Sequence, residues 1–69
     1  MKVTNDPRAV RMKLYMNQTQ FWGRIHLTQS AGSRYENGRK IPRIVQAALA
    51  IAYGTDKQSA DQVKELRGA

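Results

Sequence analysis

Residues that start and stop helices recur along this sequence, and they constrain its fold more than any other feature. Asp6 before Pro7 is typical of a helix start, because the carboxylate accepts from a free amide and proline needs no partner at the first position. Pro42 suits the same position, and Gly38 and Gly54 are natural helix ends. No stretch of five or more residues alternates between apolar and polar, so no β-strand is predicted. An all-α fold is expected.

These signals predict five helices, at about 7–16, 17–25, 29–37, 42–53 and 59–67. The fourth is apolar on much of its circumference and is expected to be the buried centre. The last is predicted to begin at Ser59, because Ser59 and Gln62 have the spacing of a capping box. A two-residue turn, His26-Leu27, is expected between the second and third helices. His26 is expected there at positive φ, which histidine adopts more often than most residues.

The chain is 69 residues long and contains no cysteine. This length favours a single domain, residues 1–69, with one small core rather than a core and a deep substrate cleft. The lack of cysteine excludes disulfides, thiolate zinc sites and a cysteine nucleophile. No apolar run approaches the roughly 18 residues of a membrane span, and the N-terminus lacks the apolar segment of a signal peptide. A cytoplasmic protein with no membrane partner is expected.

Positive charge is concentrated in the first 43 residues. The chain has 12 Lys and Arg against 5 Asp and Glu, a net charge of +7. After Arg43 the basic and acidic side chains balance, so the whole excess precedes that point. A one-sided basic excess is typical of proteins that bind a polyanion such as nucleic acid. The alternative is a basic protein with no such partner.

Catalysis finds little support. His26 is the only histidine, no cluster has metal-ligand spacing, and no serine stands in a nucleophile-elbow pattern. His26 is better interpreted as a turn residue. We therefore expect no enzymatic activity, no metal, no cofactor and no small-molecule ligand.

The second and third predicted helices have the pattern of a helix-turn-helix motif. In that motif the first helix braces the second, whose N-terminal residues enter the DNA major groove. Four polar residues share one face of the third helix or its edge: Gln29, Ser30, Ser33 and Arg34. Gln pairs with adenine, Arg with guanine and Ser with several bases. An ordinary solvated face is the alternative, but such faces usually carry acidic residues too, and none occurs here.

Residues of this region resemble the Cro and lambdoid-repressor type of helix-turn-helix domain. The matching residues are Asn17-Gln18, Phe21, Ile25, Leu27-Thr28, Ser33, Tyr35-Glu36-Asn37-Gly38 and Pro42. With Arg11 and the last two helices, the resemblance covers most of the chain, with a motif core at 11–54. It implies a compact five-helix lambda-repressor-like domain with the helix-turn-helix at about 18–37. It also implies a prokaryotic or phage transcriptional regulator, a repressor or Cro-like switch protein that binds double-stranded DNA.

The resemblance assigns roles to individual residues. It implies base reading by Gln29, Ser30 and Arg34. It implies phosphate binding by Asn17, Gln18, Asn37, Arg39 and Lys40. Amide side chains and helix N-termini bind phosphate oxygens on general grounds as well. A further candidate for phosphate binding, at the start of the fourth helix, is Arg43.

Glu36 is the only acidic residue between positions 7 and 54, and an unpaired carboxylate there would repel DNA. Relatives often have an arginine of the first helix facing this glutamate, so the resemblance implies a largely buried Arg11–Glu36 ion pair. The alternative is a solvated Glu36 whose nearest cation is Arg39 or Lys40.

Three positions depart from the family pattern. Trp22 stands where the family has Ala, His26 where it has Gly, and Gly32 where it has Ile or Val. In such domains the first and third of these positions face each other between the two helices. The large and small residues are therefore predicted to have exchanged roles with the total volume conserved, which makes Trp22 a core residue.

Assembly and partners allow alternatives. A homodimer on DNA is expected, because two copies one helical turn apart double the contacts. Val63 and Leu66 of the last helix either form the dimer contact or seal the core of the monomer. An antitoxin-type protein-interaction module with secondary DNA binding is the alternative function. A basic RNA binder is a third class, and it requires exposed aromatic rings such as that of Trp22.

Overall fold

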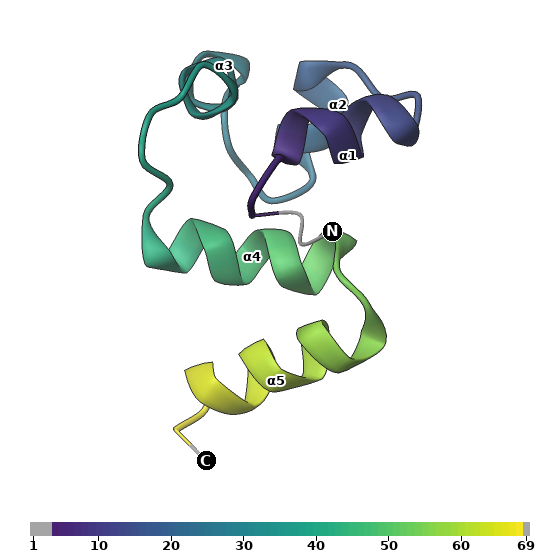
Figure 1. Cartoon of the computed structure of the whole chain (residues 1–69). Coiled ribbons are helices and arrows are strands. Elements are labelled where there is room, and N and C mark those ends of the chain that lie inside the picture. Colours follow the sequence, from purple (N-terminus) through teal and green to yellow (C-terminus); the bar gives the residue numbers. More distant parts are fainter. Residues whose placement is uncertain (1–3, 69) are drawn as a thin grey trace.

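The computed structural model describes residues 4–68, and it contains five α-helices and no strand within that range. The helices are α1 (Pro7–Lys13), α2 (Gln18–Gly23), α3 (Gln29–Glu36), α4 (Arg43–Tyr53) and α5 (Asp56–Leu66). The first three lie together on one side of α4, and α5 packs along its other side (Figure 1). The all-α, five-helix prediction is confirmed.

Capping explains where α1 begins and backbone geometry where it ends. Asp6 accepts a hydrogen bond from the Ala9 amide at 3.0 Å, and Pro7 occupies the first turn as expected. The helix ends at Lys13, earlier than the sequence indicated. Tyr15 adopts a φ of 57°, so the chain leaves the helical path before this residue. A bulky residue rarely adopts this left-handed conformation, and nothing in the sequence pattern marks it.

The prediction that the last helix begins at Ser59 was wrong. Helix α5 begins at Asp56, capped by Thr55, whose side chain accepts from the Gln58 amide at 3.1 Å. In return, Gln58 Oε1 accepts from the Thr55 amide at 3.0 Å. This capping box lies four residues before the predicted one and adds a helical turn, so that only Gly54 and Thr55 separate α4 from α5.

The hydrophobic core is built around Phe21, Trp22 and Leu49, each of which has 0 % exposure. The Phe21 ring stacks on Tyr53 at 4.2 Å between centroids and meets the Trp22 ring edge to face at 5.3 Å. Helix α4 contributes one buried stripe rather than most of its circumference, because Ile44 remains 64 % exposed. The fourth helix is therefore central in the fold, but less buried than predicted.

The packing of the large Trp22 side chain against Gly32 determines how closely α2 and α3 approach. Gly32 is buried, and a Cβ added to it would overlap the five-membered ring of the indole. Only glycine leaves this space for a ring held by the core. The prediction that Trp22 is a core residue is confirmed, and its full burial removes it as a base-stacking platform.

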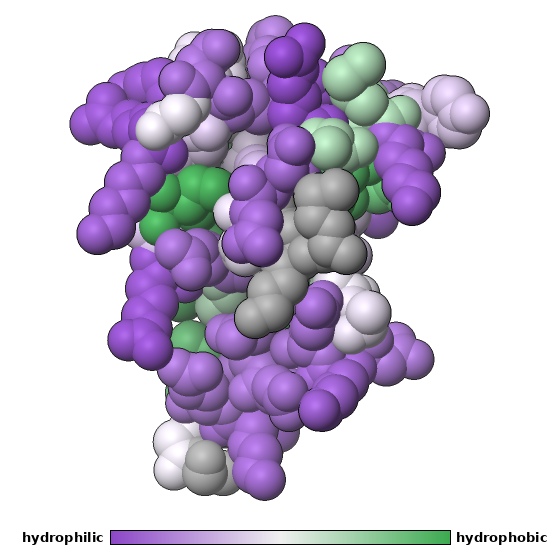
Figure 2. Space-filling model, in the orientation of Figure 1, coloured by the Kyte–Doolittle hydropathy of each residue, from purple (hydrophilic) through white to green (hydrophobic). Residues whose placement is uncertain are grey.

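The face in the orientation of Figure 1 is mostly hydrophilic, with small hydrophobic areas beside the α3–α4 connection and over the first two helices (Figure 2). Within residues 4–68, no helix has the length and apolar character needed to cross a lipid bilayer.

Candidate nucleic-acid interface

Helices α2 and α3 form the helix-turn-helix unit. The connection covers residues 24–28, longer than the two-residue turn that the sequence suggested, because α2 ends at Gly23 rather than near Ile25. His26 has a φ of 64°, as expected for its role in the turn. The Leu27 amide donates to the Trp22 carbonyl at 3.0 Å, and Thr28 caps α3 by accepting from the Ala31 amide. These bonds fix the start of α3 relative to α2.

Three of the four candidate base-reading residues are exposed on α3: Gln29 and Ser30 in its first turn and Arg34 in its last. Arg34 Nε donates to the Ser30 carbonyl at 3.4 Å, so its guanidinium lies back along the helix surface. Ser33 is half-buried, and its carbonyl accepts from Asn37 Nδ2 at 2.8 Å. No acidic residue occurs in the first turn of α3. The exposed part of this face is therefore polar and free of negative charge.

The candidate phosphate-binding residues lie in three places. Asn17 caps α2 in a capping box with Gln20, and it is exposed at the start of that helix. Asn37 caps the end of α3, followed by the exposed cations Arg39 and Lys40. Arg43 begins α4, and its guanidinium lies 3.3 Å from Glu65 in a pair that is 90 % and 56 % exposed. Such an exposed pair is weak, so it leaves the Arg43 cation available.

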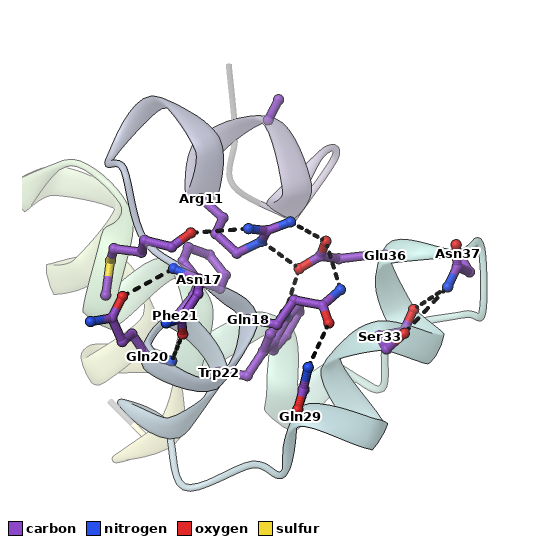
Figure 3. Close-up of polar contacts among 12 residues, drawn as sticks. Arg11, Asn17, Gln18, Gln20, Phe21, Trp22, Gln29, Ser33, Glu36 and Asn37 are labelled. Atoms are coloured by element: carbon purple, nitrogen blue, oxygen red, sulfur yellow. Dashed lines mark hydrogen bonds and ion pairs between the residues drawn. The ribbon is translucent and has the colours of Figure 1, made fainter.

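Gln18 differs from the other phosphate candidates because its side-chain amide already has two partners. Its Nε2 donates to Glu36 Oε1 at 3.3 Å, and its Oε1 accepts from Gln29 Nε2 at 3.4 Å. The side chain is half-buried between α2 and α3 (Figure 3). The sequence predicted a phosphate contact for Gln18, and it did not reveal the hydrogen bond between Gln18 and the base-reading candidate Gln29.

Arg11 and Glu36 form a two-pronged ion pair between α1 and the end of α3. Arg11 Nε lies 2.9 Å from Glu36 Oε2, and Arg11 Nη2 lies 3.0 Å from Oε1. The Arg11 and Glu36 side chains are 15 % and 3 % exposed. The third guanidinium nitrogen donates to the Met16 carbonyl at 3.0 Å. The arginine therefore holds α1, the α1–α2 turn and α3 together (Figure 3).

Glu36 accepts two further hydrogen bonds that the sequence did not reveal. Trp22 Nε1 donates to Oε2 at 2.8 Å, and Gln18 donates to Oε1. Burial acts to raise the pKa of the carboxyl, but the hydrogen bonds from Arg11, Trp22 and Gln18 and the Arg11 charge outweigh it. The pKa of Glu36 is therefore held below its ordinary value, and the group is ionised at neutral pH.

This arrangement removes a negative charge from the surface around α3. Glu36 is the only carboxylate between residues 7 and 54, and it is turned inward against four donors. Solvent and ligands at the exposed face of α3 meet amide, hydroxyl and guanidinium groups instead. Within residues 4–68, no group of three or more His, Asp or Glu side chains is placed to hold a metal ion.

Comparison with known proteins agrees with this geometry. No curated protein and no solved structure gave a significant match to the chain. The sequence model of one family, described as the RsaL-like HTH domain, matches residues 8–52, a range that includes the whole helix-turn-helix unit and nearly all of α1 and α4. The match confirms a helix-turn-helix DNA-binding family, and it does not specify the Cro and lambdoid-repressor type. The chain belongs to the RsaL-like helix-turn-helix domain family.

Proposed function

We propose that this protein is a sequence-specific regulator of transcription, a repressor or Cro-like switch protein that reads the major groove of double-stranded DNA with α3. The observation that carries the proposal is the inward-facing Glu36, the one carboxylate of α3, which leaves the exposed surface of this helix polar and without negative charge. Gln29, Ser30 and Arg34 are the base-reading residues, with Ser33 at the edge of that surface. Amide, hydroxyl and guanidinium groups on the exposed face of such a helix match the donor and acceptor pattern of base edges.

The phosphate contacts of the proposal flank this reading surface. They are made by the α2 cap, the end of α3, the following loop and the start of α4, through Asn17, Asn37, Arg39, Lys40 and Arg43. Gln18 contributes through its backbone amide in the first turn of α2, since its side chain is held by Glu36 and Gln29. A protein acting on a bacterial or phage genome in this way works in the cytoplasm.

We propose further that two copies pair through α4 and α5. Leu66 is 54 % exposed and Val63 37 %, so these residues do little to seal the core of the monomer. Leu66 and the exposed Ile44 line a shallow groove between the two helices, with Arg43 and Glu65 at its edge. A two-fold contact would bury this apolar surface.

Introducing a charge into this apolar surface tests whether two copies pair through it. Leu66→Asp is expected to shift the protein toward a monomer in sedimentation and to weaken binding to a two-half-site duplex. The matched control is Leu14→Asp, because Leu14 is similarly exposed, at 48 %, but follows α1. An unchanged oligomeric state in Leu66→Asp would contradict the proposed pairing surface.

Selection of bound sites from a random duplex pool tests the function itself. The wild-type protein is expected to enrich a short palindromic sequence, with half-sites about 10 base pairs apart. Gln29→Ala is the comparison, because it removes one proposed base contact without touching the core. A pool with no enriched sequence would contradict sequence-specific DNA binding, and an enriched sequence without symmetry would contradict the dimer.

A further inference from the structure

Helices α1 and α3 end in the same type of turn, and the turn after α1 contains an unusual residue. The Met16 amide donates to the Arg11 carbonyl at 3.2 Å, and the Tyr15 amide donates to the Met12 carbonyl at 3.1 Å, which are the two bonds of a Schellman motif. This motif needs one residue at positive φ, and glycine is the usual one. The equivalent bonds close α3 around Gly38, at a φ of 103°, whereas Tyr15 takes this position after α1, at a φ of 57°.

The Tyr15 side chain does little for the fold. It is 96 % exposed, so its ring packs on almost no other group of the protein. A side chain at this backbone conformation is strained, and glycine would make the same turn without strain. Residues held in such conformations are concentrated at binding sites, where the strain serves a contact outside the fold. The position of Tyr15 therefore points to an intermolecular contact of its ring.

Tyr15 lies beside one of the phosphate contacts of the proposed function. Only Met16 separates it from Asn17, the exposed cap of α2, so the Cα atoms of Tyr15 and Asn17 are at most about 7 Å apart. The exposed cation Lys13 shortly precedes the turn. A DNA strand whose phosphate is held at Asn17 therefore comes within reach of the tyrosine ring.

Building on the proposed function, we infer that Tyr15 binds the DNA backbone next to the phosphate held by Asn17. Its hydroxyl donates to a phosphate oxygen, and its ring packs on the adjoining deoxyribose. Tyrosine suits both groups, because it combines an apolar ring with a polar tip, and tyrosine side chains are among those that contact the DNA backbone. This contact carries no base information, but it extends the DNA-binding surface beyond the helix-turn-helix unit to the α1–α2 turn.

A protein partner is the other molecule that this part of the surface would fit. Met12 is 57 % exposed and Leu14 is 48 % exposed, so two aliphatic side chains lie near Tyr15 in the sequence. The proximity of Asn17 favours DNA. The two partners differ in a measurable way, because a protein contact predicts no effect of Tyr15 on the affinity for DNA.

Exchange of Tyr15 for glycine tests the inference, because stability and binding should change in opposite directions. Tyr15→Gly should raise the melting temperature by roughly 2–8 °C as the strain is released. Tyr15→Phe keeps the ring and the strain, so it should melt like the wild type. It should bind the preferred duplex about 10-fold more weakly, since each of two copies loses one hydrogen bond, and Tyr15→Gly should lose at least as much. The matched control is Met12→Ala, which should keep the wild-type affinity.

Replacement of the duplex phosphates one at a time by uncharged methylphosphonates locates the contact. One replacement should weaken binding of the wild type but not of Tyr15→Phe. Asn17→Ser, which keeps a capping residue on α2, should lose its sensitivity at a phosphate within about two nucleotides of that position.

Wild-type affinity in both Tyr15 variants would overturn the inference and favour a protein partner for the ring. Weaker binding without any phosphate at which Tyr15→Phe becomes insensitive would also overturn it. Failure of the proposed function is distinguishable, because the wild type would then have no preferred duplex before any Tyr15 variant is measured.

Discussion

The Arg11–Glu36 pair can be tested by a double-mutant cycle, and its burial sets the expected magnitude. Glu36→Gln keeps the shape of the side chain but removes the charge, which leaves the 15 % exposed Arg11 guanidinium without a counter-charge. Arg11→Met strands the 3 % exposed carboxylate instead. Breaking a buried pair by removing one partner costs about 3–5 kcal/mol. Each single variant is expected to lose that much free energy of unfolding.

The assay must allow for a small domain. At roughly 0.05–0.15 kcal/mol per residue, a chain of this size has a total stability of about 3–10 kcal/mol. We therefore expect the single variants to be partly unfolded, and urea titrations are best run with an osmolyte such as sucrose, which stabilises all variants. The double variant Arg11→Met/Glu36→Gln strands no charge and should lose much less than the sum of the single losses.

The exposed pair Arg43–Glu65 is the matched control. Glu65→Gln should change the free energy of unfolding by about 1 kcal/mol or less, because both side chains of that pair are largely solvated. If Glu36→Gln and Arg11→Met also lost only about 1 kcal/mol or less, the reasoning would be refuted. The link between α1 and α3 would then need another source of stability.

Three more predictions concern the core, acid stability and base reading. Trp22→Ala should cost about 3–5 kcal/mol and Gly32→Ile about 1–3 kcal/mol in urea titrations, while the double variant recovers much of the loss; simple additivity would contradict the volume exchange. Because the pKa of Glu36 is lower in the folded protein, its contribution to stability is present above the unfolded-state pKa, about 4.3, and should be lost as pH falls through the lower folded pKa. The stability of Glu36→Gln should not show this loss when it is titrated with acid. The same dependence of stability on pH in Glu36→Gln and the wild type would argue against this role of Glu36. Gln29→Ala and Arg34→Ala should each lose about 1–3 kcal/mol of base discrimination in duplex binding, with non-specific binding nearly intact; equal losses on cognate and random DNA would mean backbone contacts only.

Local signals predicted most of the secondary structure. The starts of α1, α2 and α3 were predicted because Asp6, Asn17 and Thr28 are caps whose bonds involve only residues within the next turn. The start of α5 was missed because Thr55 and Ser59 each begin a plausible capping-box pattern, and sequence alone does not decide between them. The early end of α1 depends on an unusual backbone conformation that no local pattern announces.

The site was predictable in its residue types but not in its connections. The polar face of α3 follows from helical spacing, and the exchange of Trp22 with Gly32 follows from comparing these two positions with the pattern of the family that the sequence resembles. The bonds from Trp22 and Gln18 to Glu36 depend on the distance between α2 and α3, which the packing of that exchange determines. A tertiary contact of this kind leaves no periodicity or spacing in the sequence.

The salt dependence of binding to a preferred and a scrambled duplex tests the central claim most directly. If a dimer covers about 8–10 phosphates, log K should fall against log salt with a slope of about −7 to −9. The preferred duplex should bind at least about 10³-fold more tightly than the scrambled one. Arg39→Ala and Lys40→Ala should weaken both duplexes alike and flatten the slope. A slope near zero, or equal affinity for the two duplexes, would contradict sequence-specific DNA binding by α3.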